Sequence, residues 1–127
     1  MRLPLSLVGK VIKGKERGRK LGFPTANFIL NKQIPDGIYV SQTTIDGHKF
    51  KSVTFIGAAK TFGEKDIKAE TYIIDYAQDI YGKELQVILL KKLRGNKKFT
   101  SSEELIIQID LDIKQTKEYF QKHSKSS

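Results

Sequence analysis

The sequence predicts a small closed antiparallel β-barrel with an amphipathic helix packed on its side. Short alternating or β-branched runs are separated by turn signals, which is the pattern of hairpin-linked strands. The last quarter of the chain has apolar residues at helical spacing instead. We expect residues 1–127 to form a single domain, because this length is typical of one. The sheet is expected to close into a barrel, since closure is the usual way in which a small all-β sheet removes its edges.

The first strands are expected at residues 5–12 and from Gly37 onward. Pro35-Asp36-Gly37 is a turn signal, because proline presets the first bend and glycine accommodates the rest of the turn. The runs 37–45 and 48–57 are separated by Asp46-Gly47, the pair that a two-residue type I′ hairpin turn prefers. These two runs therefore predict a hairpin.

The second half of the sheet is expected from two further runs. Residues 58–68 are polar and broken by glycine, which indicates a loop before the β-rich run Glu70–Tyr76. Residues 85–90 form a nearly continuous apolar run that suits a strand covered on both faces. Residues 94–98 then form a basic loop.

A helix is expected after Ser101. Ser101 and Glu104 form a capping-box pattern, in which both side chains satisfy free amides at a helix start. An apolar stripe comes next, at Leu105, Ile106, Ile109, Ile113 and Phe120, and the stripe excludes Glu103, Gln108, Asp112, Lys117 and Lys122. The Ser/Lys-rich tail from about His123 is expected to fray.

Composition limits the partners. A net charge of +9 and a pI of about 9.7 indicate an anionic partner. The lysines are spread along the chain, so a nucleic acid is not expected, and no apolar run is long enough to predict a membrane segment. Cysteine is absent, which permits a reducing compartment, and the cytoplasm is the default location.

The stretch from Gly9 to Asn27 is the strongest candidate for a phosphate site. Its glycines let a backbone approach a ligand closely, and Lys15 and Arg19 supply positive charge. The alternative is a basic hairpin turn with solvated lysines, and composition leaves the two open. A true P-loop is disfavoured, since Glu16 stands where a magnesium-binding Ser or Thr is required.

Three further side chains could carry chemistry. Thr25 and Asn27 are neutral oxygen donors two residues apart, so in an extended segment they point the same way and could complete a magnesium shell. The alternative is a turn stabilised by their hydrogen bonds. Glu70 is a carboxylate on an otherwise apolar strand face, which makes it a candidate base or an ion-pair partner of Lys68.

The chain resembles the riboflavin kinases. The likeness begins with GKVIKGKERGRKLGFPTANF and covers nearly the whole chain, and its GRxLGFPTAN core is far more specific than a lone glycine loop. Later landmarks occur in order: Gly37-Ile38-Tyr39, Ile56-Gly57, Thr61-Phe62, Glu70-Thr71, Asp79-Ile80-Tyr81-Gly82, Leu93-Arg94, Phe99, Leu105, Gln108-Ile109 and Asp112.

The resemblance implies a six-stranded Greek-key barrel with a carboxy-terminal helix, and transfer of the ATP γ-phosphoryl group to the 5′-hydroxyl of riboflavin, giving FMN and ADP. By the family's pattern Thr25 and Asn27 would bind Mg²⁺, Glu70 would accept the hydroxyl proton, and the loop with Arg94 would close near the flavin. The nucleotide would be bound by Gly14, Lys15, Gly18, Arg19, Lys20, Gly22, Pro24, Thr25 and Asn27.

Four positions depart from the family's pattern: Phe55, Lys60, Tyr72 and Asn96. They affect the flavin side and admit an alternative, a barrel that binds flavin nucleotide, or less favourably nucleic acid, without efficient catalysis. Many bacterial relatives carry an amino-terminal FAD synthetase domain. Arg2-Leu3-Pro4 resembles the junction before the kinase module, so such a domain is an expected partner in a longer protein.

Overall fold

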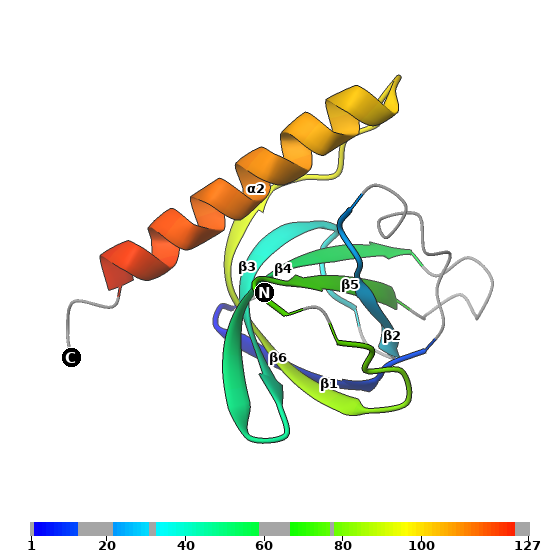
Figure 1. Cartoon of the computed structure of the whole chain (residues 1–127), viewed down its shortest axis with the longest axis vertical. Coiled ribbons are helices and arrows are strands. Elements are labelled where there is room, and N and C mark those ends of the chain that lie inside the picture. Colours follow the sequence, from blue (N-terminus) through cyan, green and yellow to red (C-terminus); the bar gives the residue numbers. More distant parts are fainter. Residues whose placement is uncertain (1, 13–21, 31–32, 59–66, 77, 124–127) are drawn as a thin grey trace.

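The fold was analysed in a computed structural model that describes residues 2–12, 22–30, 33–58, 67–76 and 78–123. Six strands build one sheet that curls into a barrel, and a long helix lies along its outside (Figure 1). The elements are β1 Leu5–Lys10, β2 Ala26–Leu30, β3 Gly37–Ile45, β4 His48–Ala58, β5 Ile67–Ile73, β6 Glu84–Arg94 and α2 Ser102–His123. The described helix is not long and apolar enough to cross a membrane.

The sheet has the strand order β1-β6-β3-β4-β5-β2, and every neighbouring pair is antiparallel. Strands β3, β4 and β5 are consecutive in sequence and in space, and β6 returns to lie beside β3, which is the Greek-key arrangement. The predicted hairpin is confirmed: Ile45 pairs with His48, and Asp46 and Gly47 both have positive φ. The predicted all-β barrel with a carboxy-terminal helix is therefore confirmed.

One strand prediction needed correction, and one strand, β2, was not predicted. The strand expected at Glu70–Tyr76 begins three residues earlier, at Ile67, and ends at Ile73. Asp75 has a φ of 62°, a left-handed backbone that ends regular pairing, so Tyr76 lies beyond the strand. Glu70 consequently sits in the middle of β5 rather than at its start. The proline-containing segment at Thr25 leads directly into β2, which the sequence did not distinguish from a loop.

The barrel closes where β1 crosses β2. A backbone bridge between Ile12 and Asn27 joins the two ends of the sheet, with the Ile12 amide donating to the Asn27 carbonyl at 2.7 Å. Gly9 lies against the ring of Phe28, and a Cβ at position 9 would come within 2.2 Å of that ring. Phe28 is fully buried, so glycine is required for the two strands to come this close.

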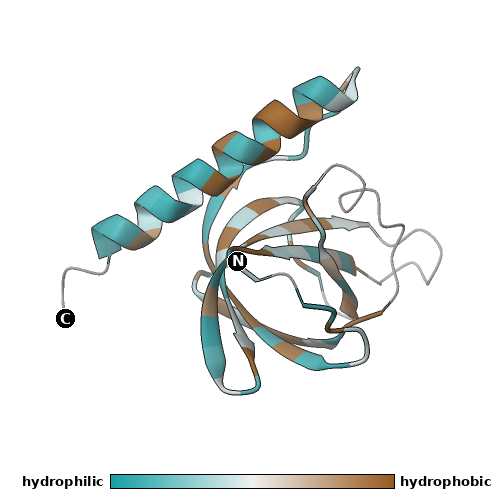
Figure 2. Ribbon diagram, in the orientation of Figure 1, coloured by the Kyte–Doolittle hydropathy of each residue, from teal (hydrophilic) through white to brown (hydrophobic). Residues whose placement is uncertain are grey.

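The barrel interior combines apolar side chains with a group of buried hydroxyls. Alternating residues face inward, and hydrophobic and polar residues accordingly alternate along the strands in Figure 2. Five hydroxyls, all fully buried, form one chain of hydrogen bonds of 2.6–3.0 Å, in the order Thr43, Ser52, Ser41, Thr54 and Thr71. These hydrogen bonds link strands β3, β4 and β5 inside the barrel.

Strand β6 contains two register shifts against β3. Between the pairs Ser41–Leu89 and Val40–Lys91 one residue of β6 is extra, and another is extra between Tyr39–Lys92 and Ile38–Arg94. Each is a β-bulge, which bends a strand and re-aims its side chains. After both, Arg94 is the partner of Ile38.

As predicted, both side chains of the capping pattern satisfy amides at the start of α2: the Glu104 amide donates to Ser101 Oγ at 3.2 Å, and the Thr100 amide donates to the Glu104 carboxylate at 3.3 Å. The apolar stripe also faces the sheet, with Ile109 buried. One assignment was wrong: Asp112, which the sequence placed outside the stripe, is fully buried and forms an ion pair with Arg94. Ion pairing is what permits a carboxylate on a buried helix face.

Gly9→Ala tests the closure. A methyl group against the buried Phe28 ring overpacks the core, so the free energy of unfolding is expected to fall by about 1–3 kcal/mol in urea denaturation. Gly57→Ala is the matched control, because position 57 is also in a strand and has open space around it. Equal stability of the two variants would contradict the role given to Gly9.

Candidate active site

Five residues on neighbouring strands form a row across the outer face of the barrel. Asn27 on β2 is the register partner of Glu70 on β5, and Glu70 is in turn the partner of Phe55 on β4. The row continues through Ile38 on β3 to Arg94 at the end of β6. Directly opposite residues in antiparallel strands share a face, with Cβ atoms about 4.5–5.5 Å apart. The fold thus makes Asn27 and Glu70, which are distant in sequence, direct neighbours.

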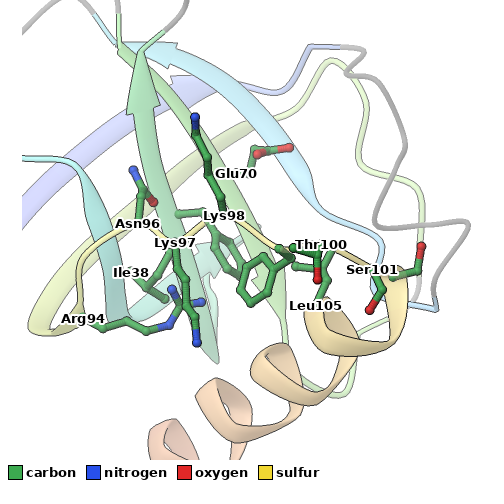
Figure 3. A pocket seen from close by; sticks show the side chains of 12 residues that line it. Ile38, Glu70, Arg94, Asn96, Lys97, Lys98, Thr100, Ser101 and Leu105 are labelled. Carbon is green, nitrogen blue, oxygen red and sulfur yellow. The ribbon is translucent and has the colours of Figure 1, made fainter.

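Glu70, Phe55, Ile38 and Arg94 line one side of an open pocket of about 990 Å³, within the range of ligand sites. Residues 96–101 and the start of α2 supply the rest of the lining, and Figure 3 shows Thr100, Ser101 and Leu105 on the side away from Arg94. Besides polar groups, the lining offers apolar and cationic side chains at Ile38, Phe55, Phe99, Leu105, Lys97 and Lys98. This lining offers apolar contacts and positive charge to the same ligand.

Asn27 lies next to this pocket and is only 4% exposed. Its Nδ2 donates to the Thr25 carbonyl at 3.2 Å, which turns Oδ1 away from that carbonyl. Oδ1 is buried and has no hydrogen-bond partner within the part of the chain that is described. A buried, unpaired amide oxygen costs about 1–3 kcal/mol. Position 27 therefore suits a ligand that binds to an oxygen lone pair, such as a cation.

These donors fit magnesium in particular. Neutral oxygen is a ligand that hard cations prefer, and Thr25 lies two residues away in a half-buried position. The described residues contain no group of three or more His, Cys, Asp or Glu side chains that could hold a metal. A magnesium ion at Asn27 would therefore draw most of its ligands from phosphate oxygens and water rather than from these side chains, as Mg²⁺ commonly does.

Glu70 combines exposure with a weak ion pair. Its Oε1 lies 3.6 Å from Lys68 Nζ, and the Glu70 side chain is 41% exposed. An ion pair this exposed contributes about 0–1 kcal/mol, so it leaves the carboxylate free to accept another hydrogen bond. Both interpretations of Glu70 from the sequence are therefore compatible: the pair with Lys68 exists, and the carboxylate still faces the pocket.

Arg94 lines the pocket, but its guanidinium is already engaged. Its Nε and Nη2 donate to the two carboxylate oxygens of Asp112 at 3.0 and 2.8 Å, and Nη1 donates to the Gly95 carbonyl at 3.1 Å. Gln108 Nε2 donates to the same carboxylate at 3.0 Å. Arg94 thus binds the helix directly, and its predicted contact with a flavin stays a prediction.

The remaining predicted residues lie just before β2 or outside the described ranges. Gly22 is exposed with a φ of 91°, and Pro24 is half-buried. Phe23 packs edge-to-face on Tyr72 of β5, with ring centroids 5.8 Å apart, which positions the segment before β2. Five predicted nucleotide-binding residues lie outside the described residues: Gly14, Lys15, Gly18, Arg19 and Lys20.

Sequence reasoning missed Asp112 and Phe99. Asp112 lies three positions after Ile109 and seven after Leu105, so helical spacing alone places it on the buried stripe. Phe99 was named as a landmark of the resemblance, without a role in the site, but it lines the pocket beside Lys97, whose Nζ lies 5.7 Å from the ring centroid. No periodicity signals this residue, because segment 95–101 is neither strand nor helix.

The chain is similar to several known proteins. The Flavokinase family, described as riboflavin kinase, matches residues 1–120. The trifunctional protein RibF/MnmA of Mycoplasmoides gallisepticum is 42% identical over 125 residues, which cover 96% of this chain and 19% of that protein. The bifunctional riboflavin kinase/FMN adenylyltransferase of Escherichia coli is 37% identical over 120 residues, covering 92% of this chain and 38% of that protein.

Two solved structures share the fold. Riboflavin kinase from Trypanosoma brucei superposes with a TM-score of 0.68 at 25% identity, covering 95% of this chain and 82% of that one. A Streptococcus pneumoniae protein titled macrolide-efflux protein superposes with a TM-score of 0.81 at 36% identity, covering 90% and 38%. The chain spans less than two fifths of the curated relatives named above. The match over residues 1–120 shows that the chain belongs to the riboflavin kinase family.

Proposed function

We propose that this chain is an ATP-dependent riboflavin kinase, which transfers the γ-phosphoryl group of ATP to the 5′-hydroxyl of riboflavin and releases FMN and ADP. The observation that carries the proposal is the pairing of Asn27 with Glu70 beside the pocket. A group suited to hold a metal-bound phosphate and a group suited to accept a proton are thereby adjacent, as a phosphoryl donor and its acceptor must be. Family membership supports the same reaction.

The residues would divide the work between donor and acceptor. Asn27 Oδ1, with Thr25, would hold Mg²⁺ bound to the ATP phosphates, and the ion would supply neutralisation of the phosphate charge. Glu70 would receive a hydrogen bond from the riboflavin hydroxyl and accept its proton as phosphorus is attacked. The pocket between the sheet and segment 95–101 would hold the flavin ring, with Phe55 and Phe99 as its aromatic contacts.

Little covalent chemistry is asked of the protein in this scheme. Phosphoryl transfer passes through a loose transition state, so positioning and charge neutralisation provide most of the rate. A carboxylate such as Glu70 suffices in this scheme, because it needs only to orient the hydroxyl and accept its proton late in the transfer. The partners are then riboflavin and FMN on one side and ATP and ADP on the other.

Glu70→Gln tests the acceptor side. The amide keeps the size of the carboxylate but cannot accept a proton, so kcat is expected to fall by about 10²–10⁴-fold while riboflavin still binds. The measurement is FMN formation with ATP and Mg²⁺, alongside riboflavin fluorescence titration. Lys68→Met is the control, because it removes the ion pair and leaves the carboxylate. A Glu70→Gln enzyme with parental turnover would rule out the assignment.

Asn27→Leu tests the donor side. Leucine has nearly the branched shape of asparagine but offers no oxygen, so magnesium-nucleotide affinity is expected to fall at least about tenfold, while the unfolding free energy of the ligand-free protein is retained or rises by about 1 kcal/mol. Calorimetric titration with Mg·ADP and urea unfolding measure the two effects. Asn96→Leu makes the same change beside the flavin site and is expected to leave nucleotide affinity unchanged.

The FMN-formation assay also separates a kinase from a barrel that binds flavin nucleotide without catalysis. The chain, riboflavin, ATP and Mg²⁺ are incubated together and the products are separated by chromatography. FMN and ADP in equal amounts support the proposal. Tight binding of FMN without any product, at enzyme concentrations comparable to substrate, would instead identify a flavin-nucleotide-binding protein.

A further inference from the structure

The Arg94–Asp112 pair is unusually complete for an ion pair near a pocket. Both carboxylate oxygens are bonded by the guanidinium, and Gln108 bonds one of them as well. Asp112 is fully buried and Arg94 is 20% exposed at its side chain. The planar guanidinium fork fits a carboxylate in one orientation, so the pair fixes the angle between β6 and α2 as well as the distance.

The pair connects the two ends of the pocket wall. Arg94 ends β6, segment 95–101 comes next, and α2 begins at Ser102, so the pair closes a loop whose middle residues line the pocket. A second tie lies inside that loop: Asn96 Nδ2 donates to the Ile56 carbonyl of β4 at 3.2 Å. In Figure 3, Arg94 and Asn96 lie on the side of the pocket away from Thr100 and Ser101.

We propose that the Arg94–Asp112 pair is a positioning latch, which holds segment 95–101 and the first turns of α2 as a fixed wall for the acceptor ligand, and that Arg94 acts through Asp112 rather than by contact with the ligand. This inference rests on the proposed function for the identity of the acceptor, riboflavin. It gives Asp112 and Gln108, which lie on the helix behind the wall, a role in acceptor affinity.

The latch makes a different prediction from a direct Arg94–flavin contact. If Arg94 acts only through Asp112, removing either partner has the same effect, and removing the second adds nothing. If Arg94 touches the ligand, Arg94→Met weakens binding whatever stands at position 112. A double-mutant cycle with Arg94→Met, Asp112→Leu and the double variant therefore separates the two. The double variant replaces the buried pair with apolar side chains, which such sites often tolerate.

The first experiment measures riboflavin dissociation constants by fluorescence titration, with KM for ATP measured separately. Each single variant is expected to weaken riboflavin binding about tenfold, because a wall held loosely misplaces its contacts, with KM for ATP unchanged. The double variant is expected to be no weaker than either single one. Additive losses, or a loss confined to the Arg94 variants, would overturn the latch.

Milder variants guard against loss of folding. Gln108→Ala removes one bond to Asp112 and leaves the pair, so a roughly threefold weaker riboflavin affinity is expected. A second mild variant, Asp112→Asn, keeps the size of the side chain and removes its charge. The matched controls make the same changes at exposed positions of the same helix: Gln115→Ala for Gln108→Ala, and Asp110→Asn for Asp112→Asn. Both controls are expected to bind riboflavin normally. Equal behaviour of each variant and its control would contradict the latch.

A readout without ligand keeps the inference separate from the proposed function. Amide hydrogen exchange of residues 95–105 is expected to rise about tenfold in Asp112→Asn, with exchange in β3 unchanged, because only the wall loses its tie. If the parent chain formed no FMN and bound no riboflavin, the proposed function would fail while faster exchange still supported the latch. Unchanged exchange in residues 95–105 would overturn it.

Discussion

The pairing of β2 with β5 is the constraint on which the site depends. Side chains alternate between the two faces of a strand, so a slip of one residue in this pairing would turn Asn27 toward the barrel interior and separate it from Glu70. The pairing is held at its end by the bridge between Ile12 and Asn27, which requires the close approach of Gly9 to Phe28. A backbone contact at the seam of the barrel thus sets the position of an amide in the site.

The interior contributes to the same alignment. Ser41, Thr54 and Thr71 lie on three consecutive strands and bond one another through their hydroxyls. In water-free surroundings each of these bonds is costly to break, because the freed hydroxyls find no other partner. A shift of β5 along β4 would break the link at Thr71, so the polar chain fixes the strand that carries Glu70. Neighbouring residues of β5 thus have separate roles: Glu70 belongs to the candidate site on the outer face, and Thr71 aligns the strand from the inner face.

Most of the fold and part of the candidate site could be predicted from the sequence. Asp46-Gly47 and the Ser101–Glu104 capping box depend on local backbone chemistry, so both were predictable and both are confirmed. The residue types at Asn27 and Glu70 were predictable as candidates, but their adjacency required the strand order, which no local pattern encodes. Asp112 was misjudged because its charged residue type was given more weight than its helical spacing, and the partner that accommodates its charge, Arg94, lies outside the helix. Local signals fail where two distant segments satisfy each other's charges.

The two bulges in β6 have a consequence for insertions and deletions. Each bulge adds a residue to β6 without changing the partner of the residues that follow, because the extra residue is left unpaired. Arg94 faces outward as the direct partner of Ile38, and from there it reaches Asp112. Loss of one extra residue between Leu89 and Arg94 would remove a bulge and keep this pairing, whereas a shift of Arg94 by one place along β3 would turn the guanidinium toward the barrel interior. The latch therefore depends on the strand partner of Arg94 and not on the length of the strand before it.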